Sequence, residues 1–500
     1  MQPRFRSGAA AGLLAAAAFA FLTACSRARA PRGPAPAGTL AFVIDSVLHS
    51  PPLERTHWGI AVIDRQTGET VIARNADHHF VPASNQKLVV AIAALALLGP
   101  DWRWETPVLI EPGPADSIAA SQLIAARGDP TWSERFFPSD LAVLDSIVAA
   151  VMRAGVRRIE GDVIIDASRF GDAKVNGTWE VGDLPFGFAP PVDAFAIAEA
   201  TFRLALEAGA SAGADALAVP IGGADWQPVI ARLRTDTLNA RPSRTFDTTA
   251  RADAVVLAGT VPLATADTLR LAVTSPADYA GRALRSRLEA GGIPVSGQVR
   301  VVRDTRIDGH GSGMHREVGR VRSPPLAEIV AGMLRPSQNW IAEQLLKTLG
   351  AELRGEGTWE AGLDVERRYL IDRAGIDSLS FVLRDASGLS VQNLLTPETI
   401  VRMLEHARAQ PWAEVFRDAL PAAGMAASTM EGRLTELADR LRAKTGTVTH
   451  VNSLSGYLVG DDGRELTFSI MTNASGRSAA SVRRGMDRIV RALADRGDPP

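Results

Sequence analysis

The sequence predicts a multidomain α+β protein, of the broad α/β type, in which an antiparallel sheet flanked by helices is interrupted by a large inserted domain. The chain has 500 residues, which is more than one ordinary domain holds. Alternating strand patterns lie near both chain ends, with helical patterns beside them. Residues 102–271 form mostly short strand-like segments between Gly, Pro and Asp. We therefore expect a main domain from residues 39–101 and 272–500 and an inserted accessory region from residues 102–271.

The first 25 residues have the pattern of a lipoprotein signal peptide. Arg4 and Arg6 precede an apolar run over residues 8–21, which is too short to span a bilayer comfortably. The run leads into Leu-Thr-Ala-Cys, which resembles a bacterial lipobox and ends at Cys25, the only cysteine of the chain. A lone cysteine is often a buried structural thiol, but the position of Cys25 after an apolar run favours lipidation.

The next residues have the composition of a tether. Residues 26–38 are rich in Arg, Ala, Pro and Gly, which is typical of a flexible linker. No later segment is long and apolar enough to cross a membrane. We therefore expect an exported protein of the cell envelope, anchored to the membrane by a lipid on Cys25 and facing the periplasm.

The elements of the main domain follow from hydrophobic periodicity and from turn and cap signals. Near the N-terminus we expect a helix at 39–49, a hairpin of strands 58–64 and 70–74, and an apolar helix at 83–98 between Pro82 and Gly99. Farther along we expect helices at 276–290, 324–334, 340–349 and 479–494, and strands at 442–449, 453–459 and 465–471. The insertion contains one clear amphipathic helix, for which Ser139 is the expected N-cap.

Charge and lysine usage narrow the functions that the chain can have. The formal net charge of -2 provides no basic footprint, so we expect no nucleic-acid partner. Arginine supplies nearly all of the positive charge, and lysine occurs only at positions 87, 174, 347 and 444. Arginine stays protonated in proteins, whereas a lysine can lose its proton when it is buried. Lysines that lie inside short motifs are therefore informative.

The first motif is Ser84-x-x-Lys87, at the start of the apolar helix. Positions i and i+3 share a helix face, so the hydroxyl and the amine can meet. A serine hydroxyl needs a nearby base to become a nucleophile, and a lysine with a lowered pKa can be that base. The start of a helix also offers a backbone N–H for an oxyanion hole. A capping serine beside a solvated lysine explains the same pattern, and the motif alone is weak.

Two further motifs occur later in the chain. Ser337-Gln338-Asn339 lies between two helical segments, where the hydroxyl can relay a proton and the amide can hold a peptide group; a capping serine is the ordinary explanation. Lys444-Thr445-Gly446-Thr447 lies in a strand, where glycine permits close approach of a ligand; an edge strand protected by a lysine is the ordinary explanation. Three such motifs in this order make coincidence a poor explanation.

Together the three motifs resemble the signature of penicillin-binding proteins and serine β-lactamases. The length of the segment between Ser84 and Ser337 resembles that in one branch of these proteins. This branch is the low-molecular-mass class C penicillin-binding proteins, or D-alanyl-D-alanine carboxypeptidase/endopeptidase family. Four other segments agree with this family, with Ala386 in place of a usual Gly: 127–131 (Arg-Gly-Asp-Pro-Thr), 161–170 (Gly-Asp-Val to Phe), 385–397 (Asp-Ala-Ser-Gly-Leu-Ser to Thr-Pro) and 444–457 (Lys-Thr-Gly-Thr to Ser-Gly-Tyr). Residues 211–247 match nothing that can be named.

The resemblance implies a penicillin-binding transpeptidase fold and assigns roles to the motif residues. The implied catalytic residues are the nucleophile Ser84, the general base Lys87, the proton relay Ser337 and its partner Lys444. The implied substrate-binding residues are Asn339, Thr445, Gly446 and Thr447, with the backbone N–H groups of Ser84 and Thr447 as the oxyanion hole. The substrate would be the D-Ala-D-Ala end or cross-link of peptidoglycan peptides, and β-lactams would acylate the same serine.

No metal or other cofactor is expected. His78, His79, His310 and His315 are not framed by acidic or cysteine ligands, so we interpret them as loop surface. Two alternatives to the peptidase remain open at this point. One is a serine β-lactamase that deacylates penicillin rapidly, and the other is a catalytically silent lipoprotein that binds peptidoglycan.

Overall fold

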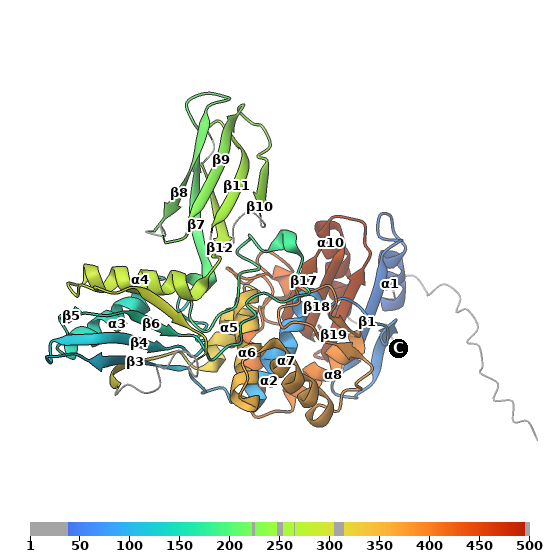
Figure 1. Ribbon diagram of the computed structural model, residues 1–500. Coiled ribbons are helices and arrows are strands. Elements are labelled where there is room, and N and C mark those ends of the chain that lie inside the picture. Colours follow the sequence, from blue (N-terminus) through green and yellow to red (C-terminus); the bar gives the residue numbers. More distant parts are fainter. Residues whose placement is uncertain (1–38, 223–225, 248–253, 265, 305–314, 496–500) are drawn as a thin grey trace, which may run out of the picture.

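The computed structural model describes residues 39–222, 226–247, 254–264, 266–304 and 315–495 (Figure 1). The predicted signal peptide, the tether, Cys25 and His310 lie outside these ranges. Within them, no helix is long and apolar enough to cross a membrane.

The main sheet joins the two ends of the chain, as the sequence predicts. Its strand order is β17-β18-β19-β1-β2, and all neighbours are antiparallel. The five strands are β1 (His57–Asp64), β2 (Thr70–Arg74), β17 (Leu441–Val448), β18 (Val451–Val459) and β19 (Glu465–Asn473). Nearly every residue of β18 is buried, which shows that both faces of the sheet are covered. The antiparallel sheet predicted from the strand patterns is confirmed.

Helices from the two chain ends cover one face of this sheet. They are α1 (Leu40–Leu48) and α10 (Ala479–Ala494), which contact each other and share a hydrophobic cluster with the strands. Trp58 of β1 and Met486 of α10 lie in that cluster. Helix α1 begins after Thr39, whose side chain caps the helix by accepting from the Phe42 N–H.

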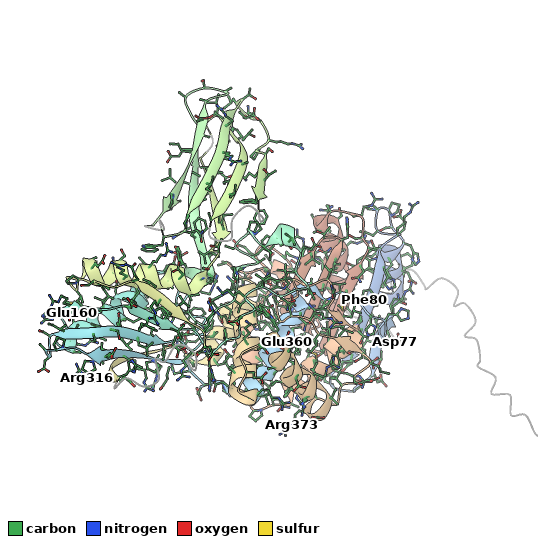
Figure 2. The ribbon with its side chains drawn as sticks, in the orientation of Figure 1. Asp77, Phe80, Glu160, Arg316, Glu360 and Arg373 are labelled. Carbon is green, nitrogen blue, oxygen red and sulfur yellow. The ribbon has the colours of Figure 1, made fainter. Side chains whose placement is uncertain are left out.

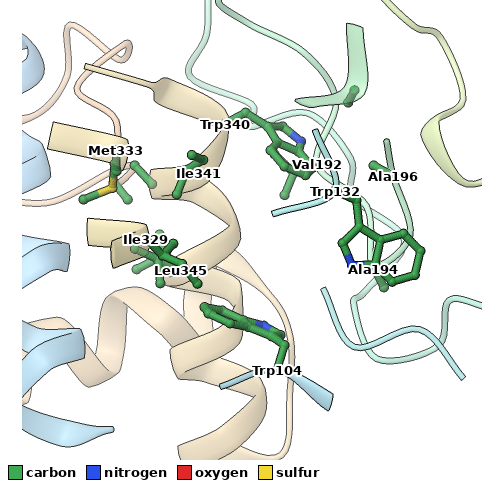
Figure 3. Close-up of a cluster of buried hydrophobic side chains, with 14 of the residues drawn as sticks. Trp104, Trp132, Val192, Ala194, Ala196, Ile329, Met333, Trp340, Ile341 and Leu345 are labelled. Carbon is green, nitrogen blue, oxygen red and sulfur yellow. The ribbon is translucent and has the colours of Figure 1, made fainter. Parts of the chain in front are cut away.

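A helical layer covers the opposite face and contains the first motif. Its elements are η1 (Ala83–Gln86), α2 (Lys87–Leu97), α5 (Leu326–Leu334), α6 (Asn339–Arg354), α7 (Trp359–Arg368), η4 (Tyr369–Arg373), α8 (Pro397–Arg408) and α9 (Ala413–Ala419), with the short strands β15 (Phe381–Val382) and β16 (Leu394–Leu395). The short turn η5 (Thr435–Leu437) lies on the other face, where it contacts α10. Residues 88–95 of α2 are all buried, so α2 is the central helix of the layer. Figure 3 shows Ile329, Met333, Ile341 and Leu345 packed between α5 and α6.

The first part of the insertion is a mixed sheet with two helices. The sheet order is β13-β6-β4-β3-β14, with β5 beside β4. Its elements are β3 (Glu105–Pro112), β4 (Ile118–Ala125), α3 (Ala142–Arg153), β5 (Arg158–Ile159), β6 (Val163–Asp166), η2 (Val181–Asp183), α4 (Pro276–Ala290), β13 (Val299–Val302) and β14 (Arg316–Arg322). Figure 2 shows that Glu160 and Arg316 mark the end of this sheet farthest from Phe80 in the main domain.

The strand pairing bears on where the insertion ends. β13 pairs with β6, and β14 pairs with β3, although both strands follow residue 272 in the sequence. Helix α4 also packs on β13 and α3. We therefore propose that the insertion continues to about residue 323, past the expected limit of residue 271, because the chain must return to complete the sheet that it began at β3.

The second part of the insertion is a separate six-stranded unit with the order β10-β11-β9-β8-β7-β12. Its strands are β7 (Thr201–Glu207), β8 (Asp215–Ile221), β9 (Val229–Asp236), β10 (Arg244–Asp247), β11 (Val255–Pro262) and β12 (Ala266–Ala272), preceded by η3 (Ala198–Ala200). It has a small core of its own, centred on Leu257, and projects away from the rest of the molecule (Figure 1).

One local prediction is wrong. Helix α3 begins at Ala142 with Leu141 as its N-cap, and the Ser139 side chain makes no cap bond. Only the Ser139 carbonyl takes part, by accepting from the Ala142 N–H at 3.3 Å. The apolar face of the helix is confirmed, since Leu144, Ile147 and Val148 are buried.

Candidate active site

The first motif forms a hydroxyl–amine pair at the junction of η1 and α2. Lys87 Nζ lies 3.0 Å from Ser84 Oγ. The predicted apolar helix starts with a 3-10 turn, in which Ser84 is half-buried and Lys87 is fully buried. Two further acceptors hold the amine, Asn339 Oδ1 at 2.6 Å and the Ser387 carbonyl at 2.6 Å. The amine is therefore fixed in place beside the hydroxyl.

Burial controls the charge of Lys87. Loss of solvation lowers its pKa from 10.5 to about 7, although the carboxylates of Asp385 and Glu343 oppose this change. A lysine with a pKa near 7 is largely neutral at slightly alkaline pH and can accept a proton from a neighbouring hydroxyl. The structure thus gives Lys87 the property that a general base needs.

A second hydroxyl–amine pair lies across the cavity from the first. Lys444 Nζ donates to Ser337 Oγ at 2.8 Å and to the Thr445 carbonyl at 2.7 Å. Burial, followed by repulsion from Lys87, holds the pKa of Lys444 well below its usual value. Ser337 has a φ of 65°, in the left-handed region, and Ala83 beside Ser84 has a φ of 47°. Such backbone strain in residues other than glycine often occurs at functional sites.

Gly446 brings the strand β17 against the Ser84 turn. A Cβ at this position would overlap Ser453 Oγ, and it would lie 2.9 Å from both the Ser84 nitrogen and the Pro82 carbonyl oxygen. Ser453 itself donates to the Pro82 carbonyl at 2.7 Å, which ties β18 to the same turn. The absence of a side chain at residue 446 is what allows strand and nucleophile to lie this close.

A cavity of about 280 Å³ opens in front of these groups. Its lining residues are Ser84, Ser337, Thr429, Arg433, Thr445, Gly446, Thr447, Ser453 and Arg483. A larger hollow of about 790 Å³ lies elsewhere, between α5 and α9, and includes none of the motif residues. The smaller cavity is therefore the candidate active site, because the hydroxyls of both pairs face it.

The structure brings together all eight motif residues that the sequence singles out. Five of them line the cavity, and the other three, Lys87, Asn339 and Lys444, are held behind the wall by hydrogen bonds to it or to each other. Asn339 bridges two parts of the chain, since its amide nitrogen also donates to the Phe188 carbonyl at 2.8 Å. The insertion thus contacts the rim of the site.

Sequence reasoning missed several residues at the site. Arg433 is paired with Asp487 at 2.6 Å, whereas Arg483 makes no ion pair with a described carboxylate. No pattern in one sequence marks either arginine, because each comes from a region without a motif. Ser453 lies on the strand after the Lys-Thr-Gly strand and pairs with Gly446. The expected hairpin of these two strands is the feature of the sequence that could have indicated Ser453.

The described residues contain no group of three or more histidine, cysteine or acidic side chains that could hold a metal ion. Among the histidines considered from the sequence, His79 approaches the Leu379 carbonyl at 3.1 Å. That contact is a tie between two loops and lies outside the cavity.

The fold and the site define a serine hydrolase, in which a buried lysine lies against the hydroxyl of a cavity serine opposite a hydroxyl-lined strand. A model of the D-Ala-D-Ala carboxypeptidase 3 (S13) family matches residues 40–494, and the chain belongs to this family. The predicted family, fold and peptidase activity are therefore confirmed.

Individual relatives agree with this assignment. A D-alanyl-D-alanine carboxypeptidase from an Actinomadura species is 32% identical over 470 residues, which is 90% of this chain and 84% of the relative. The crystal structure of penicillin binding protein 4 from Haemophilus influenzae has a TM-score of 0.79 at 21% identity and covers 90% of this chain and 98% of its own. A β-lactam complex of the same Haemophilus influenzae protein has a TM-score of 0.73 at 20% identity, with the same coverage.

Proposed function

We propose that this protein cleaves the D-Ala-D-Ala ends or cross-links of peptidoglycan stem peptides through an acyl-enzyme on Ser84. The observation that carries the proposal is the 3.0 Å contact between Ser84 Oγ and a Lys87 amine whose pKa is lowered to about 7. A neutral amine in that position is the general base that a serine nucleophile requires.

In the first step, Ser84 Oγ attacks the carbonyl carbon of the penultimate D-Ala, and its proton passes to Lys87 Nζ. The developing oxyanion is received by the backbone N–H groups of Ser84 and Thr447, which flank the cavity. Asn339 holds both the amine of Lys87 and the carbonyl of Phe188, so it aligns the base with the edge that faces a substrate backbone.

In the second step, the C–N bond breaks and the leaving amine takes a proton from Ser337. Lys444, 2.8 Å from Ser337 Oγ, donates to that hydroxyl and supports the transfer. Ser337 recovers its proton from Lys444. Water then attacks the Ser84 ester and gives one proton to Lys444, and Ser84 Oγ takes back the proton held by Lys87 as the shortened peptide leaves. No redox partner or metal takes part in this sequence of bonds.

The carboxylate beside the scissile bond needs a cationic or hydroxyl-lined pocket. Thr445 and Thr447 supply hydroxyls on β17, with Gly446 between them. Arg483 adds a guanidinium that lines the same cavity and has no carboxylate partner among the described residues. A guanidinium binds a carboxylate with two parallel hydrogen bonds, so we include Arg483 in the carboxylate pocket.

The same cavity explains penicillin binding, because a β-lactam places a reactive amide carbonyl next to a carboxylate. The Haemophilus influenzae relative has been solved with a β-lactam, which supports the proposal.

Envelope localisation is implied by the family's substrate. The lipid anchor on Cys25 stays a prediction from the sequence. We expect the protein to incorporate labelled palmitate and its processing to be blocked by globomycin. Both effects should be absent from Cys25→Ala.

Labelling with fluorescent penicillin separates the three candidate functions. A peptidase gives a stable label that Ser84→Ala loses, and it releases D-Ala or splits dimers when purified muropeptides are resolved by mass. A β-lactamase loses its label rapidly and consumes excess penicillin. A silent binding protein takes no label and still sediments with peptidoglycan. Failure of wild-type protein to react with either penicillin or muropeptides contradicts the proposed function.

A further inference from the structure

A cluster of buried carboxyl groups lies behind Lys87, on the side away from the cavity. Three acidic residues form it: Glu343 on α6, Glu366 on α7 and Asp385 in the loop before β16. Each has a side chain that is fully buried, with exposures of 0%. Burial of three carboxyl groups costs free energy unless they are paired, bonded or protonated. Their position next to the general base suggests that the cluster serves the reaction.

Glu343 binds the loop that supplies an acceptor to Lys87. Its Oε1 accepts from the Ser387 N–H at 2.7 Å and from the Ala386 N–H at 3.1 Å. The Ser387 carbonyl, in turn, accepts from Lys87 Nζ at 2.6 Å. Trp359 Nε1 donates to the other oxygen of Glu343 at 2.7 Å and fixes the carboxylate from the far side.

The loop has a second fixed point at Asp385. Its carboxylate accepts from the Gly388 and Ser390 N–H groups at 2.8 and 2.7 Å and from Asn393 Nδ2 at 2.7 Å. A Cβ at Gly388 would overlap the Ala83 carbonyl oxygen, so the loop packs directly on the Ser84 turn. The loop at residues 385–390 therefore packs between α6 and the turn that contains Ser84.

Helix α6 reaches the Lys87 amine by two routes. Asn339 and Glu343 lie four residues apart, on the same face of the helix. Asn339 contacts the amine directly, and Glu343 contacts it through the backbone of Ser387. A displacement of Glu343 would move one of the two acceptors that orient the base.

Glu343 and Glu366 differ in how their surroundings treat the ionised carboxylate. Burial and then Asp385 raise the pKa of Glu343 to about 7. Burial, Glu343 and Asp385 raise the pKa of Glu366 well above its usual range, and neither of its oxygens has a hydrogen-bond partner among the described residues. Glu366 thus has no hydrogen bond that would stabilise its ionised form, whereas Glu343 accepts three that do.

Two other lysines face this region. Lys347, one turn beyond Glu343 on α6, lies 4.0 Å from the Trp359 ring centre, and burial lowers its pKa to about 8. Lys444 faces Lys87 from β17. Asp193 raises the pKa of Lys347, whereas Asp385 and Glu343 are the carboxylates that raise the pKa of Lys87.

We propose that Glu343 is a positioning residue, which holds the Ser387 carbonyl against Lys87 and whose negative charge sets the pH at which Lys87 loses its proton. The proposal rests on the proposed role of Lys87 as the general base. It assigns no comparable effect to Glu366, which is not among the carboxyl groups that raise the pKa of Lys87.

The test uses the small number of lysines. With only four lysines in the chain, at positions 87, 174, 347 and 444, carbon-13 labelling of the lysine ε-carbons gives few resonances, and Lys87→Arg identifies the one from Lys87. We expect Glu343→Gln to lower the titration midpoint of Lys87 by about one pH unit, the size expected for loss of a nearby opposite charge. The matched control, Glu366→Gln, should leave the midpoint unchanged.

The second readout is the pH profile of penicillin acylation. In Glu343→Gln the acid limb should move with the Lys87 midpoint, and the maximal rate should fall at least tenfold because the Ser387 carbonyl is less firmly held. An unchanged midpoint in a folded Glu343→Gln protein, or equal changes in both variants, overturns the inference. If Glu343→Gln does not fold, Trp359→Phe removes one donor to Glu343 and should lower the Lys87 midpoint; no change there overturns it as well.

The titration does not depend on catalysis, so it separates this inference from the proposed function. A wild-type protein that titrates as expected but never reacts with penicillin contradicts the proposed function alone. A reactive protein in which Glu343→Gln leaves the Lys87 midpoint in place contradicts only the role of Glu343.

Discussion

The replacement Gly446→Ala tests whether close approach of β17 to the nucleophile is required. The added Cβ would overlap Ser453 Oγ and lie 2.9 Å from the Ser84 nitrogen and from the Pro82 carbonyl oxygen. Since two of these neighbours are backbone atoms, the strand must move away from the Ser84 turn. Such overpacking costs about 1–3 kcal/mol of folding free energy. A misplacement of roughly 1 Å in an active site lowers the rate by about 100-fold.

The assay measures the second-order rate of acylation by fluorescent penicillin together with the thermal midpoint. Gly182→Ala is the matched control, because a Cβ there meets nothing within 4 Å. The double variant Gly446→Ala with Ser453→Ala removes the contact with Oγ but keeps the two backbone contacts. It should regain stability while acylation stays slow. Wild-type acylation by a stable Gly446→Ala protein would refute the reasoning.

Three other predictions concern charge at the site. Acylation should fall about tenfold for each pH unit below the Lys87 pKa of about 7, since the neutral amine is the base, and a stopped-flow pH profile measures this. Arg483→Ala should raise KM at least fivefold for peptides with a free terminal carboxylate and little for their amides, whereas exposed Arg484→Ala should change neither. Lys444→Met should slow acylation at least 100-fold with Ser337 still in place, and a normal rate would exclude the proposed proton relay.

Much of the fold is predictable from the sequence because its elements have strong local signals. Helix α4 runs from Pro276 to Ala290, as its proline start and its periodicity predict. The hairpin of β1 and β2 and the three C-terminal strands also follow from alternation. That the two chain ends form one sheet depends on long-range pairing, which local patterns do not reveal. The order of the three motifs implies it, because it resembles that of a family with such a sheet.

The features that were not predictable depend on contacts between distant residues. Glu343 appears in the sequence as an ordinary helical residue, and its partners Ala386 and Ser387 lie on a loop about 40 residues away. The pairing of β13 with β6 and of β14 with β3, on which we base the proposed limit near residue 323, also joins residues far apart in the sequence. Ser139 is a reasonable cap by type, but the chain enters α3 through Leu141 instead.

The most direct test of the account is intact-protein mass spectrometry after reaction with penicillin, followed by peptide mapping. We expect one adduct with the full mass of the antibiotic, located on the peptide that contains Ser84. It should be absent from Ser84→Ala and should form far more slowly in Lys87→Arg, which keeps a charge but has no accessible neutral state. An adduct on another residue, or an equal yield from Ser84→Ala, would contradict the claim that Ser84 and Lys87 form the nucleophile and its base.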